Sequence, residues 1–178
     1  IDLVPYQTAV FGADQPHVEG WIRDIWQPGS VTGTMDFLDA LNQRIATELS
    51  YIVRDEPGVQ SPARTVSRGK GSCRDVATLF IEACRSCGLA SRFVSGYLLN
   101  DAAADPAQAA STHAWSEIYL PGSGWRGFDS TSGLVVGGDH IAAAVHRHPE
   151  AVPPIAGSFV GTLNAKPKLK VELHVQRL

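Results

Sequence analysis

The fold of this chain is decided by the stretch GKGSCRD, residues 69–75, which reads as a tight turn running into a helix. Ser72 is a favoured N-cap residue, and Asp75 stands three positions later, where a carboxylate can reach back to the N-cap backbone. Apolar residues then recur at helical spacing until Gly88, a typical stop signal. The pattern predicts a helix over about Cys73–Cys87 whose first turn carries a cysteine.

This position would make the Cys73 thiol reactive. The partial positive charge at a helix N-terminus and its free N–H groups lower the pKa of a thiol from its reference value of about 8.5, and a neighbouring imidazolium lowers it further. A backbone N–H there can also bind a developing oxyanion. The alternative is that Cys73 is a small buried hydrophobic residue, the common fate of a lone intracellular cysteine.

A histidine and an aspartate follow in two segments that predict paired strands. His113 begins the first, residues 113–120, and Asp129 lies in the second, residues 125–131. The intervening PGSG at 121–124 is a hairpin signal, so the two side chains should lie on neighbouring strands at similar height. A two-residue turn would offset them by about three residues, and a bulge or wider loop would be needed to bring them directly opposite.

The rest of the chain predicts further helices first and strands afterwards. In chain order, these are a helix after Pro16 that stops at Pro28, a helix over 34–52, a short helix from Ser61-Pro62 to Gly69, a strand over 92–99, an exposed loop over 100–110, and strand-like segments at 155–163 and 169–175. Helices that precede strands favour an α+β domain with an antiparallel sheet.

The composition is that of an ordinary globular domain. The chain has 178 residues, 44% of them hydrophobic and 19% charged, which is enough for one core and excludes disorder. A net charge of −3 gives no field that would attract nucleic acid or an anionic membrane, and no apolar run approaches the roughly 20 residues that span a bilayer. Three cysteines cannot all pair, so we expect free thiols and a cytoplasmic location. We expect one domain over 1–178, taken from a longer protein because it begins at Ile1 rather than Met.

Two further clusters have both a chemical and a structural interpretation. Cys84 and Cys87 form a C-x-x-C pair, but no second pair follows at zinc-finger spacing and the motif ends a helix, which favours core packing. His140, His146 and His148 lack a carboxylate or cysteine at metal-ligand spacing, which favours exposed or structural histidines. The sequence also lacks a calcium-loop pattern. We therefore predict no metal and no cofactor.

Four motifs together resemble the bacterial transglutaminase-like superfamily. They are GSCRD at 71–75, RFVSGY at 92–97, THAWSE at 112–117 and GWRGFDST at 124–131. The resemblance spans most of residues 63–131 and implies a papain-like core, in which N-terminal helices and a nucleophile helix pack on an antiparallel sheet. It also implies that Cys73 is the nucleophile, His113 the base and Asp129 the residue that orients the base.

The chain departs from the family pattern at three places. Ser130 stands where a proline usually follows the aspartate, and Arg74 stands where many members have glutamine. Neither change removes a catalytic group. The segment 139–150 diverges from a family stretch rich in Gly-Arg-Asp.

The predicted function is thiol-dependent acyl transfer at amide bonds of a peptide or protein substrate. The thiolate attacks the carbonyl to form a thioester, which water hydrolyses or a lysine amine converts into an isopeptide bond. We rank hydrolysis, as by a cysteine protease, above crosslinking. The open alternatives are an inactive transglutaminase-like binding module and a thiol redox protein that uses Cys84 and Cys87. Polar or aromatic candidates for a substrate pocket are Trp21, Trp26 and Gln60.

Overall fold

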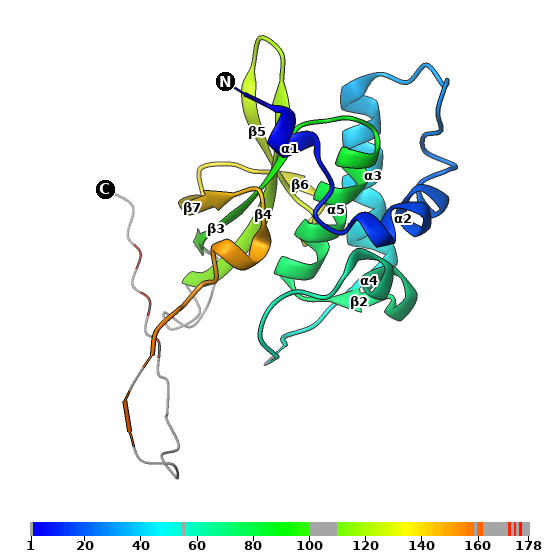
Figure 1. The fold of residues 1–178 in the computed structure, drawn as a ribbon. Helices are drawn as coiled ribbons and strands as arrows, with labels where there is room; N and C mark the ends of the chain where they lie inside the picture. The colour runs from blue at the N-terminus through cyan, green and yellow to red at the C-terminus, as the bar shows by residue number, and fades with distance from the viewer. Residues whose placement is uncertain are drawn as a thin grey trace.

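The computed structural model describes residues 2–54, 56–99, 110–158, 160, 161, 171, 173 and 175. Its central element is helix α5 (Cys73–Ser86), which lies between a five-stranded sheet and most of the other helices (Figure 1). Every residue from Asp75 to Arg85 is buried. A helix that is surrounded in this way must find a partner within the protein for each charge that it carries.

The sheet has the strand order β6-β5-β4-β3-β7, and every neighbouring pair is antiparallel. The strands are β3 (Ser91–Leu99), β4 (Ala110–Leu120), β5 (Gly124–Asp129), β6 (Leu134–Val135) and β7 (His140–His146). The three central strands and the β4–β5 hairpin confirm the sequence predictions. The α+β class, with the helix that begins at Cys73 packed on an antiparallel sheet, is confirmed as well.

The other helices precede α5, as predicted. They are α1 (Val4–Gln7), α2 (Gln15–Trp21), α3 (Thr34–Glu48) and α4 (Pro62–Arg68). One 3-10 turn lies at Gly12–Asp14, before α2, and another lies at Pro149–Ala151, after β7. Both α2 and α3 end earlier than the periodicity predicts. For α3 the reason is that β1 (Ser50–Tyr51) leaves the helix to pair in parallel with β2 (Lys70–Gly71). Within the described residues, no helix has the length and apolar character needed to cross a bilayer.

The main core lies between α5, the sheet and the N-terminal helices. Phe80 of α5 stacks on Phe128 of β5 with ring centroids 5.5 Å apart. The predicted apolar stripes of α2 and α3 supply the opposite side of this core, with Val18, Leu38, Leu41 and Ile45 fully buried. Burial of this apolar surface is what fixes α5, and therefore its first residue, against the sheet.

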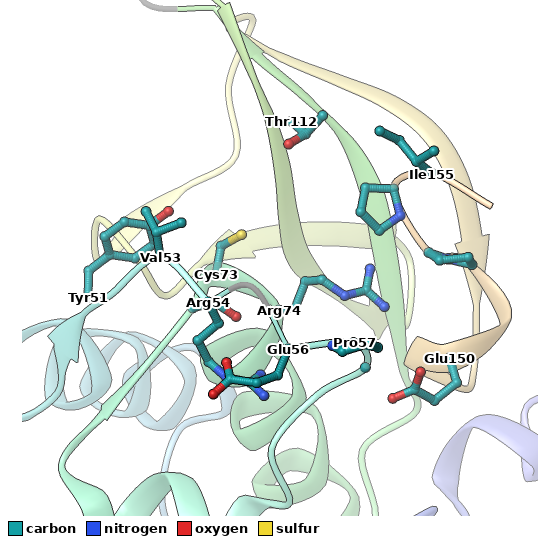
Figure 2. A pocket seen from close by; sticks show the side chains of 14 residues that line it. Tyr51, Val53, Arg54, Glu56, Pro57, Cys73, Arg74, Thr112, Glu150 and Ile155 are labelled. Carbon is teal, nitrogen blue, oxygen red and sulfur yellow. The ribbon is translucent and has the colours of Figure 1, made fainter. Parts of the chain in front are cut away.

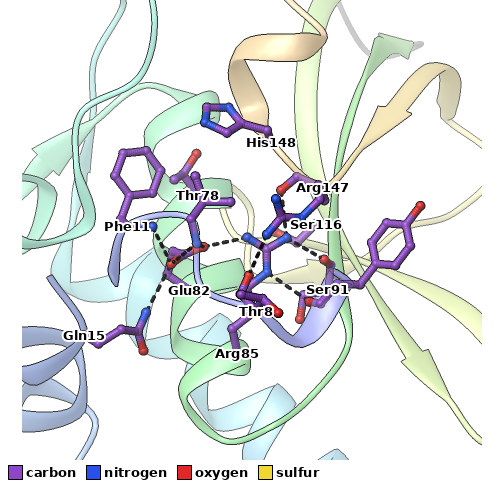
Figure 3. Close-up of polar contacts among 12 residues, drawn as sticks. Thr8, Phe11, Gln15, Thr78, Glu82, Arg85, Ser91, Ser116, Arg147 and His148 are labelled. Atoms are coloured by element: carbon purple, nitrogen blue, oxygen red, sulfur yellow. Dashed lines mark hydrogen bonds and ion pairs between the residues drawn. The ribbon is translucent and has the colours of Figure 1, made fainter. Parts of the chain in front are cut away.

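Two buried charges in α5 pair with each other, and together they tie distant segments to the helix. Glu82 and Arg85 form an ion pair at 2.6 Å (Figure 3). Glu82 also accepts hydrogen bonds from the N-terminal segment, at Val10 N, Phe11 N and Gln15 Nε2. Arg85 donates to three backbone carbonyls, those of Tyr6, Ser91 and Arg147. The pair thus joins the N-terminus, the start of β3 and the end of β7.

The sequence analysis missed strand β7, as it missed the short elements α1, β1, β2 and β6. The three alanines of β7, 142–144, favour a helix by intrinsic propensity, but the strand is held by antiparallel pairing with β3. The strand-like segment predicted at 155–163 is wrong for its described residues, which form no strand. The predicted loop over 100–110 and the strand-like segment at 169–175 lie mainly outside the described residues.

Candidate active site

Cys73 is the first residue of α5, where it is half-buried at the edge of a pocket. Ser72 before it has an extended backbone (φ −80°, ψ 171°), and its N–H donates to Asp75 Oδ2 at 2.8 Å. The predicted capping box is therefore present. Because the box fixes how the chain enters the helix, the sulfur stands at the N-terminal end of α5, where the helix dipole favours negative charge.

Asp75 also ties the nucleophile turn to the loop that precedes α4. Its side chain is fully buried, and its oxygens accept hydrogen bonds from Gln60 N at 2.7 Å, Gln60 Nε2 at 3.2 Å and Arg54 Nη1 at 2.8 Å. These bonds are additional to those from Ser72 N and Oγ. The carboxylate is thus the common anchor of two segments that meet at Cys73.

The three residues proposed from sequence as pocket candidates have other positions. Gln60 is buried against Asp75, as described above. Trp21 and Trp26 pack against the main core. None of the three is among the described residues that line the pocket beside Cys73, so this prediction was wrong.

We expect the substitution Asp75→Asn to lower the free energy of unfolding by about 2–3 kcal/mol. The amide would place N–H donors against existing donors, and among the described residues it would leave the largely buried Arg54 guanidinium with Glu56, at 3.5 Å, as its ionic partner. Chemical denaturation measures the loss. Asp36→Asn, which removes an exposed acid from the first turn of α3, is the matched control. A loss no larger than that of the control would show that the Asp75 network contributes little.

His113 and Asp129 are brought together by the register of the β4–β5 hairpin. Leu120 pairs with Gly124, so the connecting loop has three residues, which is the wider loop that the sequence analysis left open beside a two-residue turn. Continuing this register puts Asp129 opposite Trp115, two residues from His113, which makes them diagonal neighbours on one face. His113 Nε2 and Asp129 Oδ2 are 2.9 Å apart. The longer loop is therefore sufficient to turn the predicted adjacency into a contact.

The three residues lie close together at one end of the sheet. His113 lines the same small recess as Cys73, and because its Nε2 faces Asp129, Nδ1 is the nitrogen left to face the sulfur. Burial opposes the charged form of His113, but the hydrogen bonds to Asp129 and Cys73 outweigh it and raise the pKa of His113 to about 9. Burial likewise opposes ionisation of Asp129, yet hydrogen bonds from His113 and His140 hold its pKa well below the usual range. At neutral pH the pair is an imidazolium and a carboxylate.

The end of β5 is fixed by two hydrogen bonds, one of them from Ser130, which stands where the family pattern has proline. Ser130 Oγ donates to Asn42 Oδ1 of α3 at 2.9 Å, and Thr131 N donates to Asp129 Oδ1 at 3.0 Å. The first bond attaches the strand end to α3, and the second fixes the plane of the Asp129 carboxylate. The serine therefore anchors this turn by a hydrogen bond.

His140 is a site residue that the sequence analysis did not predict. It begins β7, and its Nε2 lies 3.2 Å from Asp129 Oδ2. The sequence analysis considered it with His146 and His148 as a metal cluster and rejected that cluster. These two histidines lie at the other end of β7, where His148 N donates to His146 Nδ1. His140 reaches the site because β7 pairs with β3, and no local sequence pattern predicts that pairing.

Three side chains of metal-binding types lie together in this cluster. His113, Asp129 and His140 each offer one potential ligand atom, and these atoms lie within 4.8 Å of one another. Nε2 of both histidines is at hydrogen-bond distance from Asp129 Oδ2, so the three groups satisfy one another and we assign no metal to them.

A pocket of about 340 Å³ opens beside Cys73 (Figure 2). Tyr51 and Val53, from the segment around β1, lie on one side of the sulfur, and Thr112 and Ile155 lie on the other. The lining combines apolar and polar groups.

The two walls of the pocket are held by charged side chains. Arg74 donates to the carbonyls of Val152 at 3.0 Å and Pro149 at 2.7 Å. Glu150 accepts a hydrogen bond from Val59 N at 2.9 Å, which joins the segment after β7 to the loop after β1. Arg74, the departure from the family's glutamine, thus positions the wall that faces the nucleophile.

The other two cysteines lie away from this site. Cys84 is fully buried in the main core, and Cys87 is half-buried at the C-terminal end of α5. Burial raises the pKa of the Cys84 thiol, and it raises the pKa of Cys87 to about 11. Because redox exchange and metal ligation both need the thiolate, this environment favours the structural interpretation over the redox one.

Comparison with known proteins identifies the family. The family model described as the transglutaminase-like superfamily matches residues 24–130. This chain belongs to the transglutaminase-like superfamily. Among curated relatives, "Uncharacterized protein Rv2569c" of Mycobacterium tuberculosis is 30% identical over 138 residues, which is 69% of this chain and 41% of the relative. "Uncharacterized protein ML0607" of Mycobacterium leprae is 31% identical over 134 residues, 74% of this chain and 47% of the relative. The chain therefore spans less than half the length of these two relatives.

Solved structures share this superfamily fold. A "Putative Cysteine Protease" from Cytophaga hutchinsonii has a TM-score of 0.66 at 23% identity, over 83% of this chain and 47% of that one. The periplasmic domain of TgpA from Pseudomonas aeruginosa has a TM-score of 0.53 at 20% identity, over 75% and 49%. LapG of Legionella pneumophila has a TM-score of 0.54 at 13% identity, over 82% and 84%. One of these domains is periplasmic, so the fold does not assign a compartment and the cytoplasmic location stays a prediction.

Proposed function

We propose that this transglutaminase-like chain is an enzyme that transfers acyl groups from amide bonds through a thiol nucleophile, with peptide hydrolysis as the net reaction. The observation that carries the proposal is the placement of Cys73 and His113 in one recess, with His113 hydrogen-bonded to Asp129 and Cys73 at the N-terminus of a buried helix beside a pocket. A nucleophile within reach of a base, which is oriented by a third group, is the arrangement that covalent acyl transfer requires.

Each residue has a defined role in the proposed reaction. The Cys73 thiolate attacks the amide carbonyl, and the oxyanion that forms is stabilised by a backbone N–H in the first turn of α5. The His113 imidazolium gives its proton to the departing amine, which leaves a thioester on the sulfur. Water then attacks the thioester with His113 as the base, and the thiol is released. Asp129 holds His113 in the useful tautomer throughout.

Hydrolysis is proposed in preference to crosslinking. Support comes from the shared fold with the C. hutchinsonii protein, which is described as a "Putative Cysteine Protease". The proposed substrate is a peptide or protein amide, with no role for nucleic acid or membrane. Addition of a primary amine probe separates the two reactions, because hydrolysis leaves a new carboxylate whereas transamidation attaches the amine to the product.

The proposal is tested by the pH dependence of iodoacetamide alkylation, followed at each cysteine by mass spectrometry. We expect Cys73 to react well below pH 8, because the His113 imidazolium persists to about pH 9 and favours the thiolate beside it. His113→Ala should slow the reaction of Cys73 at pH 6.5 by about tenfold or more.

Two controls make this measurement specific. His146→Ala removes an exposed histidine outside the site and should leave the Cys73 rate unchanged. Cys87 is an internal reference, because its raised pKa should keep it slow below pH 9 in every variant. If Cys73 reacts as slowly as Cys87 in the parent protein, the enzyme proposal fails and an inactive binding module becomes the better interpretation.

A further inference from the structure

The carboxylate of Asp129 is shared between two histidines. Its Oδ2 lies 2.9 Å from His113 Nε2 and 3.2 Å from His140 Nε2. A carboxylate oxygen only accepts hydrogen bonds, so both Nε2 atoms must carry protons. The mechanism above uses His113 and leaves His140 without a role.

His140 is a rigid donor at this position. Its side chain is 9% exposed, and its ring meets Trp115 edge-on, with centroids 5.2 Å apart and planes at 83°. Its backbone pairs with Leu98 of β3. Among the described residues, its buried Nδ1 has no hydrogen-bond partner. The bond from Nε2 to Asp129 is therefore the side-chain hydrogen bond that the described residues offer this ring.

A hydrogen bond to a carboxylate spreads its negative charge, and a carboxylate with less charge attracts a second proton donor less strongly. We propose that His140 is a positioning residue that acts through Asp129 to limit how tightly the carboxylate retains the proton of His113. The proposed reaction needs this limit, because a general acid must release its proton to the departing amine. That catalytic consequence rests on the proposed function, whereas the coupling of the two histidines does not.

The remaining contacts of Asp129 keep its carboxylate oriented when His140 is replaced, so the loss of the His140 hydrogen bond can be tested without a change in that orientation. Thr131 N holds Oδ1 at 3.0 Å, and His113 holds Oδ2, so the carboxylate keeps two fixed bonds when His140 is replaced. The titratable groups that act on His113 are Cys73 from α5 and Asp129 from β5, with His140 from β7 acting through Asp129. Arg74 lines the same small recess as His113 and adds a fixed positive charge.

The experiment is an NMR titration of the His113 imidazole in the full chain, with Cys73→Ala as the common background so that the thiol does not titrate with it. His140→Phe keeps a ring against Trp115 and removes the donor. We expect the His113 pKa to rise by about 0.5–1 unit in this variant. His140→Gln places an amide N–H near the position of Nε2, and it should keep the His113 pKa close to the background value.

His140→Asn provides a second test in case the phenylalanine variant does not fold. Its amide takes the place of Nδ1 and does not reach Oδ2, so it should raise the His113 pKa as phenylalanine does. An unchanged or lowered His113 pKa in the folded Phe or Asn variant overturns the proposal, and so does a rise in the Gln variant equal to that in Phe. Failure of the proposed function is seen separately, as slow Cys73 alkylation in the parent chain, and it leaves the titration result standing.

Discussion

Asp129→Asn is expected to lower the turnover of an amide substrate by about 10³–10⁴-fold while the protein stays folded. The asparagine amide has no charge to stabilise the His113 imidazolium. Its N–H can also donate to Nε2, which moves the ring proton to Nδ1, where it faces Cys73 and blocks proton uptake. The measurement is kcat/KM on a peptide selected by screening a peptide mixture for cleavage by the parent protein.

The control for this variant is Asp39→Asn, which makes the same chemical change at an exposed position of α3. It should cleave the selected peptide at the parent rate. A loss of less than tenfold for Asp129→Asn, with an unchanged thermal midpoint, would contradict the assigned role of Asp129. Equal losses in both variants would show that the assay reports stability rather than chemistry.

Arg85→Ala is expected to lower the free energy of unfolding by about 3–5 kcal/mol. The substitution leaves the Glu82 carboxylate fully buried without its ionic partner, and it deprives the carbonyls of Tyr6, Ser91 and Arg147 of a donor. One of these carbonyls, that of Tyr6, belongs to the N-terminal segment, so residues 4–11 should also separate from α5 more readily. Equilibrium denaturation measures the total loss, and amide hydrogen exchange of residues 4–11 measures the local one.

Arg126→Ala, at an exposed position of β5, is the matched control and should change the free energy of unfolding by less than about 0.5 kcal/mol. The double variant Glu82→Met with Arg85→Met should lose less than the sum of the two single methionine variants, because it leaves neither charge buried alone. Additive losses would show that the two side chains are not energetically coupled.

Local sequence signals were sufficient for much of the site. A serine followed three residues later by aspartate fixed the start of α5 and the place of Cys73, because a capping box involves only neighbouring residues. Ser61-Pro62 and Gly69 likewise fixed both ends of α4, where Ser61 accepts from Arg64 N and Gly69 has φ +61°. The hairpin signal between β4 and β5 brought His113 and Asp129 to neighbouring strands.

The tertiary structure decided what depends on segments far apart in the chain. It set the β4–β5 register, whose three-residue loop places His113 within 2.9 Å of Asp129. Pairing with β3 makes the alanine-rich segment a strand, β7, and places His140 beside the same carboxylate. Gln60, a pocket candidate from sequence, instead donates a hydrogen bond to buried Asp75. Caps, turns and periodicity are read from adjacent residues. Pairing of a strand with a distant edge, and satisfaction of a buried charge, depend on what the rest of the chain places nearby.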